Sequence, residues 1–234
     1  MRIEVLYPEL CSLYGEMANL RYLQQSLPQA EIVQTHLGDT PACLLGKAEL
    51  VYLGAMTERG QALALEQMRR HREEYRHMID GGTVVLATGN AMELFGTSID
   101  ELSGLELLDF SAVRDMEHRH NSMFLGKFGE MEIVGAKSQF SHTKSPVEPA
   151  LFEVIGGFGT DLKSKQEGIH IQNFFGTYLL GPLLPLNPLF TQHLMGLLGS
   201  AEKPAFFEAA MQACHHRIQE LKQPGVNFSV GEHG

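Results

Sequence analysis

The chain has 234 residues, of which 44% are hydrophobic and 20% are charged, a composition typical of a globular protein. Its formal net charge of −10 and the lack of a Lys/Arg-rich stripe argue against nucleic acids and membrane surfaces as partners. No apolar run approaches the roughly 18 residues that cross a bilayer, and the N-terminus has no signal-peptide pattern. The widely spaced Cys11, Cys43 and Cys214 form no CxxC motif, so we expect reduced thiols and a cytoplasmic protein.

The first part of the chain alternates between strand-like and helix-like segments. The helical patterns cover residues 15–28, 57–82 and 90–96, with Thr57 as the N-cap of the second and a Gly-Gly pair at its end. Such alternation predicts right-handed βαβ units on a parallel sheet. The expected strands are residues 2–8, 30–37, 48–56 and 83–87.

The second part begins with short β-like runs separated by Gly, Ser and Asn, which predict hairpins. These runs are residues 105–115, 120–128, 131–140 and 152–157. A strand and a Gly/Pro-rich loop follow at 167–188, and then two helices at 189–199 and 204–223. No repeat or linker is visible, so we predict one domain over residues 1–225 and a flexible tail over 226–234.

A strand-to-helix elbow is predicted within "VVLATGNAMELFG", residues 84–96. In many α/β enzymes this turn presents a nucleophile, and the first N–H groups of the following helix suit an anion or oxyanion. The apex here is Thr88, Gly89 and Asn90, without cysteine or serine. Thr88 would need a neighbouring base to act as a nucleophile, so a turn residue that bonds to the backbone is the simpler interpretation.

A metal or nucleotide cofactor is not expected. His118, His120 and His142 could lie close together, but carboxylates at fitting spacing, HExxH and CxxC are all missing, and loop histidines in solvent are the simpler interpretation. Neither GxGxxG nor GxxxxGK[ST] occurs.

Two segments carry a family resemblance. "EGIHIQNFFGTYLLGPLLPLNP", residues 167–188, resembles the C-terminal signature GTYLHGPxLPxNP of the CobB/CobQ-like class I glutamine amidotransferases. "SLYGEMANLRYL", residues 12–23, resembles their N-terminal NLYGDxGNxxxL, and "LELLDF" resembles the start of their middle β region. The resemblance is strongest to the GatD type, which pairs with a Mur-ligase-like MurT subunit to amidate peptidoglycan precursors. It implies a flavodoxin-like α/β domain, with a mostly parallel central sheet flanked by helices and a small antiparallel β region.

The residues that carry the chemistry in that family are replaced in this chain. There, the cysteine of CGGYQxLG attacks the glutamine amide, and the histidine of YLHG activates it. Leu180 stands at the histidine position. Gly89 stands at the cysteine position in an ungapped alignment, and Thr88 takes that position if one gap is allowed. His142, in "SQFSHT", falls where the family has the arginine that holds glutamine.

The resemblance therefore implies a subunit that does not hydrolyse glutamine and serves as partner or regulator of a Mur-ligase-like enzyme. A ligand in the former active-site cleft would contact Gly54, Ala55, Asn90 and His142, since residues 54–56 correspond to the oxyanion-hole loop. His170, beside the replaced catalytic position, is expected to be structural.

Other hypotheses remain open at this stage. The chain could be an enzyme with altered chemistry, using the elbow as an anion site with Thr88 or His142. An active thiol could come from Cys11 or Cys43. The family signature is shared by cell-wall and cobalamin-related branches, and the sequence does not separate them.

Overall fold

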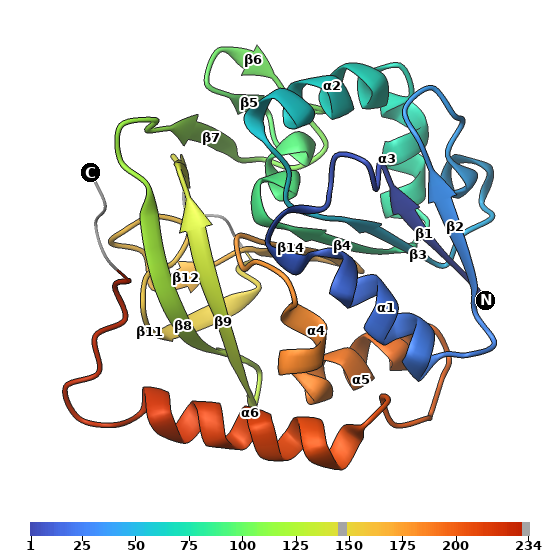
Figure 1. The fold of residues 1–234 in the computed structure, drawn as a ribbon. Coiled ribbons are helices and arrows are strands. Elements are labelled where there is room, and N and C mark those ends of the chain that lie inside the picture. Colours follow the sequence, from blue (N-terminus) through green and yellow to red (C-terminus); the bar gives the residue numbers. More distant parts are fainter. Residues whose placement is uncertain (145–148, 231–234) are drawn as a thin grey trace.

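The computed structural model of the chain describes residues 1–144 and 149–230 (Figure 1). Its centre is a six-stranded sheet with the order β13-β14-β4-β3-β1-β2. All neighbours are parallel except β13, which pairs antiparallel with β14. The strands are β1 (Arg2–Leu6), β2 (Glu31–Thr35), β3 (Leu50–Leu53), β4 (Val84–Thr88), β13 (Ile169–Ile171) and β14 (Phe174–Thr177).

Helices cover both faces of this sheet (Figure 1). Successive side chains of a strand point to opposite faces, so Val51 and Leu53 pack in one core while Leu50 and Tyr52 pack in the other. The first face is covered by α2 (Glu58–Arg69), α3 (Arg72–Asp80) and the 3-10 helix η3 (Gly89–Phe95). The second face is covered by α1 (Met17–Ser26), α4 (Leu183–Leu186) and α5 (Pro188–Leu197). Two further 3-10 helices are η1 (Leu13–Gly15) and η2 (Ala42–Leu45).

Two four-stranded sheets lie beside the central sheet. One has the order β10-β7-β5-β6 and the other, fully antiparallel, β12-β11-β8-β9. The helix α6 (Phe207–Leu221) packs on the latter through Cys214 and Ile218 against Leu125 and Val134. The strands are β5 (Ser98–Ile99), β6 (Leu102–Ser103), β7 (Ser111–Arg114), β8 (His120–Phe128), β9 (Met131–Gln139), β10 (Ser141–Thr143), β11 (Phe152–Gly156) and β12 (Gln166–Glu167).

Several sequence-based elements differ from the structure. The run expected over 105–115 is a strand only at Ser111–Arg114, and the Gly/Pro-rich loop contains the helix α4. The single helix expected over 57–82 is two helices, because the backbone leaves the helical region at His71 with φ −129° and ψ 31°. The segment after the elbow is a 3-10 helix, which is tighter than the α-helix expected there. The one strand expected before the Gly/Pro-rich loop is a hairpin of β13 and β14.

The last described part of the chain packs against the helix α6. Val226 and Phe228 pack beside α6, and residues 231–234 of the predicted tail lie outside the described residues. The flexibility of that tail and the single domain over 1–225 stay predictions.

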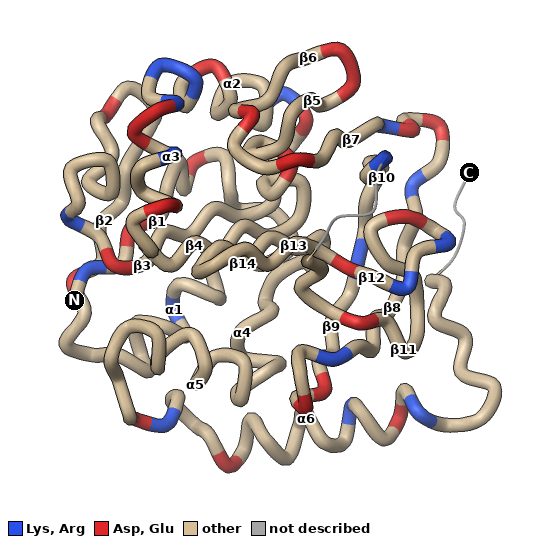
Figure 2. The backbone as a smooth tube through the Cα atoms, turned by 180° about the vertical axis from the view of Figure 1, so that it is seen from behind, with Lys and Arg blue, Asp and Glu red and all other residues tan. Residues whose placement is uncertain are grey.

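Basic and acidic positions are interspersed along the chain (Figure 2). None of the described helices combines the length and the apolar character that a membrane span requires.

Candidate functional site

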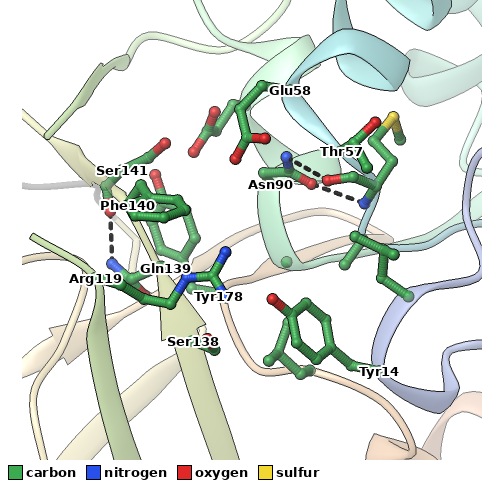
Figure 3. A pocket seen from close by; sticks show the side chains of 16 residues that line it. Tyr14, Thr57, Glu58, Asn90, Arg119, Ser138, Gln139, Phe140, Ser141 and Tyr178 are labelled. Atoms are coloured by element: carbon green, nitrogen blue, oxygen red, sulfur yellow. Dashed lines mark hydrogen bonds between the residues drawn. The ribbon is translucent and has the colours of Figure 1, made fainter. Parts of the chain in front are cut away.

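The carboxyl ends of three parallel strands meet at the elbow. β4 ends at Thr88, β3 continues into Gly54 and Ala55, and β14 leads to Leu180. In open parallel sheets this edge is where ligands bind. A pocket of about 100 Å³ lies here (Figure 3). Its lining includes Leu13, Tyr14, Ala55, Met56, Thr57, Glu58, Gly89, Asn90, Glu93, Arg119, Ser138, Gln139, Phe140, Ser141, Tyr178 and Leu180.

Gly89, which the ungapped alignment places at the nucleophile position, has no room for a side chain. Gly89 has φ +59°, a left-handed conformation that favours glycine. A Cβ placed on it would lie 2.5 Å from the Ala55 Cβ and 3.3 Å from the Leu180 Cδ2. Ala55 and Leu180 thus occupy the space into which a side chain at position 89 would extend.

Asn90 ties the elbow to the loop after β3. Its Oδ1 accepts a 3.0 Å hydrogen bond from the Met56 N–H, and its Nδ2 donates to the Met56 carbonyl at 2.9 Å (Figure 3). The pocket therefore contains Ala55 and Asn90 from the expected ligand set, and Met56 N–H is already engaged.

Beneath the elbow, the fully buried Glu16 connects four segments of the chain. The Thr88 hydroxyl donates to Glu16 Oε2 at 2.6 Å, and the Gly181 N–H donates to Oε1 at 2.8 Å. The Tyr52 hydroxyl also bonds to Oε2, and Asn19 Nδ2 lies 3.4 Å from it. Thr88 is fully buried, so its hydroxyl serves this network and not the pocket.

Burial dominates the ionisation of this network. It raises the pKa of the Glu16 carboxyl, and the hydrogen bonds from Thr88, Tyr52 and Gly181 offset only part of that effect. The pKa of Tyr52 is raised well above its ordinary value by burial and then by the neighbouring Glu16 charge. Sequence reasoning matched this segment to the family signature but did not single out Glu16.

No thiol reaches the pocket. Cys11 is fully buried, Cys43 is 3% exposed, and neither lines the pocket. Burial raises the pKa of the Cys11 thiol to about 12, and burial together with Glu4 raises that of Cys43 further. Because the thiolate is the nucleophile, the geometry gives no support to the hypothesis of an active thiol from either residue.

The histidines lie away from the elbow. His142 is on β10, its ring 4.9 Å from that of His120, and neither His142 nor Gly54 lines the pocket. Burial, and then His120, lower the pKa of His142. His170 stacks on Phe175 at 4.5 Å, which agrees with a structural role. Within residues 1–144 and 149–230 no group of three His, Cys, Asp or Glu side chains could hold a metal ion.

Polar groups that sequence reasoning did not single out line the same pocket. Glu93, Gln139 and Tyr178 are buried. Glu93 interacts with the hydroxyls of Tyr178 and Ser141, whereas Gln139 Oε1 has no hydrogen-bond partner among the described residues. The Arg119 guanidinium lies 4.3 Å above the Phe140 ring and points into the pocket, where Tyr14 faces it (Figure 3). Arg119 directly precedes β8 and is far from the elbow in sequence, so no local pattern reveals this approach.

Two curated proteins are similar to the chain over most of its length. The chain is 26% identical over 191 residues to the subunit GatD of the glutamine-hydrolysing lipid II isoglutaminyl synthase of Staphylococcus aureus, covering 79% of this chain and 78% of the relative. It is 24% identical over 201 residues to the subunit of the same name from Streptococcus pneumoniae, covering 80% and 76%. No protein-family model matches the chain.

Solved structures give the fold. A glutamine amidotransferase crystal structure matches with a TM-score of 0.55 at 13% identity, covering 84% of this chain and 99% of that one. A Thermotoga maritima glutamine amidotransferase matches with a TM-score of 0.53 at 12% identity, covering 94% of each chain. The predicted fold class and the resemblance to GatD-type subunits are confirmed.

Proposed function

We propose that this chain is a GatD-like subunit that has lost glutaminase activity and acts as partner or regulator of a Mur-ligase-like, MurT-type enzyme on peptidoglycan precursors. One observation supports the loss above all others. In the ungapped alignment Gly89 stands where the family has its nucleophile, and Ala55 fills the space that a side chain there would need. The similarity to GatD subunits supports the rest of the proposal.

The chemistry of amide hydrolysis explains why these replacements matter. A covalent mechanism needs a nucleophile and a base within hydrogen-bond reach, and losing either lowers the rate by several orders of magnitude. Leu180 offers no proton acceptor, and Thr88 donates its hydroxyl to Glu16 below the elbow. The nearby thiol of Cys11 is buried and protonated at neutral pH.

A direct assay tests the loss of activity. The protein is incubated with L-glutamine, and glutamate and ammonia are measured, with the Staphylococcus aureus GatD complex as positive control. We expect release at the background rate, both alone and after mixing with the Mur-ligase-like protein of the same organism. Turnover comparable to the positive control would contradict the proposal.

The partner is tested by co-expression with that Mur-ligase-like protein, followed by size-exclusion chromatography with light scattering. We expect a stable complex, and the amidation of lipid II by the partner is then measured with ammonia, with glutamine, and with this chain omitted. If the amidation of lipid II with ammonia requires this chain, the chain has a regulatory role. A complex with a cobalamin-pathway protein in place of the Mur-ligase-like one would favour the cobalamin branch.

A second candidate function is the binding of a small ligand in the former active-site cleft, with or without altered chemistry. The observation that favours it is the buried Gln139 Oε1 at the pocket, which has no hydrogen-bond partner among the described residues. A buried polar group without a partner is costly, and a bound ligand, ion or water molecule is one explanation for it.

A further inference from the structure

We infer that the edge of β8 carries a strand-addition site, that the chain's own residues 226–230 fill this site, and that a second copy of the chain docks its residues 226–230 there in exchange. We call residues 226–230 the strap. The site consists of Gly156 and the backbone of Asn121 and Met123, none of which lines the pocket at the elbow. It is therefore separate from the proposed function.

The site exists because β11 covers only part of β8. The two strands pair from Leu125 to Lys127, with a shift of register just before β11 ends at Gly156. Gly157 then has φ +89°, and a Cβ on it would lie 2.5 Å from the Met123 carbonyl oxygen. The chain thus turns away tightly over β8 and leaves the edge of residues 120–123 open to another strand.

The strap takes this open edge as an antiparallel strand. The Met123 N–H donates to the Phe228 carbonyl at 2.8 Å, and the Val230 N–H donates to the Asn121 carbonyl at 3.1 Å. Between these bonds Ser122 lies opposite Ser229. Figure 1 shows the chain turning back after α6 and running along the sheet that contains β8 and β11. Main-chain bonds of this kind give affinity in strand addition, and side-chain pockets give specificity.

Gly156 provides such a side-chain pocket for the Phe228 ring. A Cβ on Gly156 would lie 2.5 Å from the Phe228 Cε1 and closer still to its Cζ, and its three nearest atoms would all belong to this ring. The Gly156 backbone is not left-handed, so the ring and not the backbone requires glycine here. The site therefore selects an extended segment with an aromatic side chain at the position of Phe228.

The strap is built to detach. It follows a turn in which the Val226 N–H donates to the Gln223 carbonyl at 3.3 Å, with Pro224 and a left-handed Gly225 at the two central positions. Residues 222–225 are exposed, and so are Asn227, Ser229 and Val230 of the strap. Segments with few buried contacts open at low free energy, so this turn can act as a hinge.

The occupant of the site identifies the partner. A second copy presents the same backbone groups and the same aromatic ring, so two opened copies can exchange straps and keep every contact except those of the hinge. Within one chain the strap has an effective concentration on the order of 1 mM, so it docks on its own β8 in dilute solution. Exchange should therefore increase with protein concentration.

Covalent trapping tests the exchange. Ser122 and Ser229 form a non-hydrogen-bonded antiparallel pair, in which Cα atoms lie about 4.5 Å apart and a disulfide fits. Full-length Ser122→Cys and Ser229→Cys proteins are mixed under oxidised glutathione, and the disulfide between the two copies is measured by non-reducing electrophoresis and mass mapping. The three native cysteines are buried, which keeps their background low.

The matched control pairs Ser122→Cys with Ser103→Cys, an exposed serine outside the strap. We expect the Ser229→Cys mixture to give about fivefold more cross-linked dimer than this control, and the yield to rise with protein concentration. Equal yields in the two mixtures would overturn the exchange between copies.

Two further changes in the Ser122→Cys copy locate the aromatic pocket. Phe228→Ala weakens only that copy's own strap, so the cross-link to the other copy should increase about threefold or more. Adding Gly156→Ala fills the space of the incoming Phe228 ring and should cancel this increase. An increase that survives Gly156→Ala, or no increase at all, would contradict the proposed site. Circular dichroism on every variant shows whether it is folded.

Discussion

Gly89 and Ala55 fit each other so closely that a Cβ on Gly89 would lie 2.5 Å from the Ala55 Cβ. Gly89→Cys should therefore destabilise the protein by about 1–3 kcal/mol through overpacking, in addition to the cost of a side chain at φ +59°. It should also show no glutaminase activity, because Leu180 remains. Urea unfolding measures the first effect, and ammonia release measures the second.

A double-mutant cycle gives the control. Ala55→Gly should relieve the overpacking, so the double variant should be more stable than the sum of the two single changes predicts. Additive effects would mean that Ala55 does not fill the nucleophile's space.

Glu16 should contribute strongly to the free energy of unfolding, because its one carboxyl group accepts several buried hydrogen bonds. Glu16→Ala leaves the buried Thr88 hydroxyl and the Gly181 N–H without their acceptor, so we expect a loss of about 3 kcal/mol or more. Glu16→Gln keeps an acceptor for Gly181 and should cost clearly less. Urea unfolding at neutral pH measures both losses. A larger loss for Glu16→Gln than for Glu16→Ala would contradict the prediction.

The free energy of unfolding should also depend on pH because of the buried Glu16 and Glu93 carboxyl groups. Burial raises the pKa of Glu16 and of Glu93 above the ordinary value of 4.5, so the folded state holds their protons more tightly than the unfolded state does. The favourable contribution of each group is complete below that value and is lost as the pH rises through the raised pKa. The stability of the parent relative to Glu16→Gln should therefore fall from pH 4.5 upward. A constant difference between the two proteins across this range would contradict the buried, proton-retaining environment.

The sequence predicts the strands β8 and β9 to within a residue because alternation and flanking turns are local signals. The sequence also places Thr88, Gly89 and Leu180 at one edge of the sheet, and the structure brings Gly89 and Leu180 together at the pocket. The sequence does not reveal Arg119 at the pocket, because that placement depends on how the antiparallel sheet packs beside the elbow. The break at His71 has no glycine or proline to mark it.

Lys137 and Glu167 form a buried ion pair behind the pocket wall. Their Nζ and Oε1 lie 3.4 Å apart, both side chains are fully buried, and Glu167 also accepts from the Tyr178 N–H at 2.8 Å. Lys137→Met leaves a buried carboxylate without its cation, so we expect a loss of about 3–5 kcal/mol in urea unfolding. Adding Glu167→Gln should recover part of that loss, and a further loss of the full size would show that the two charges do not interact.

Thiol labelling should separate the buried cysteines from a reactive one. Cys11 and Cys43 are 0% and 3% exposed, and burial raises the pKa of the Cys11 thiol to about 12, so the native protein should resist iodoacetamide at pH 7.5 at both positions. In urea all three cysteines should be alkylated, which controls for reagent and peptide recovery. Mass mapping after digestion identifies the modified residues. Rapid labelling of Cys11 in the native protein, blocked by a ligand of the pocket, would support the hypothesis of an active thiol near the elbow. Only an exposed thiolate reacts in this way.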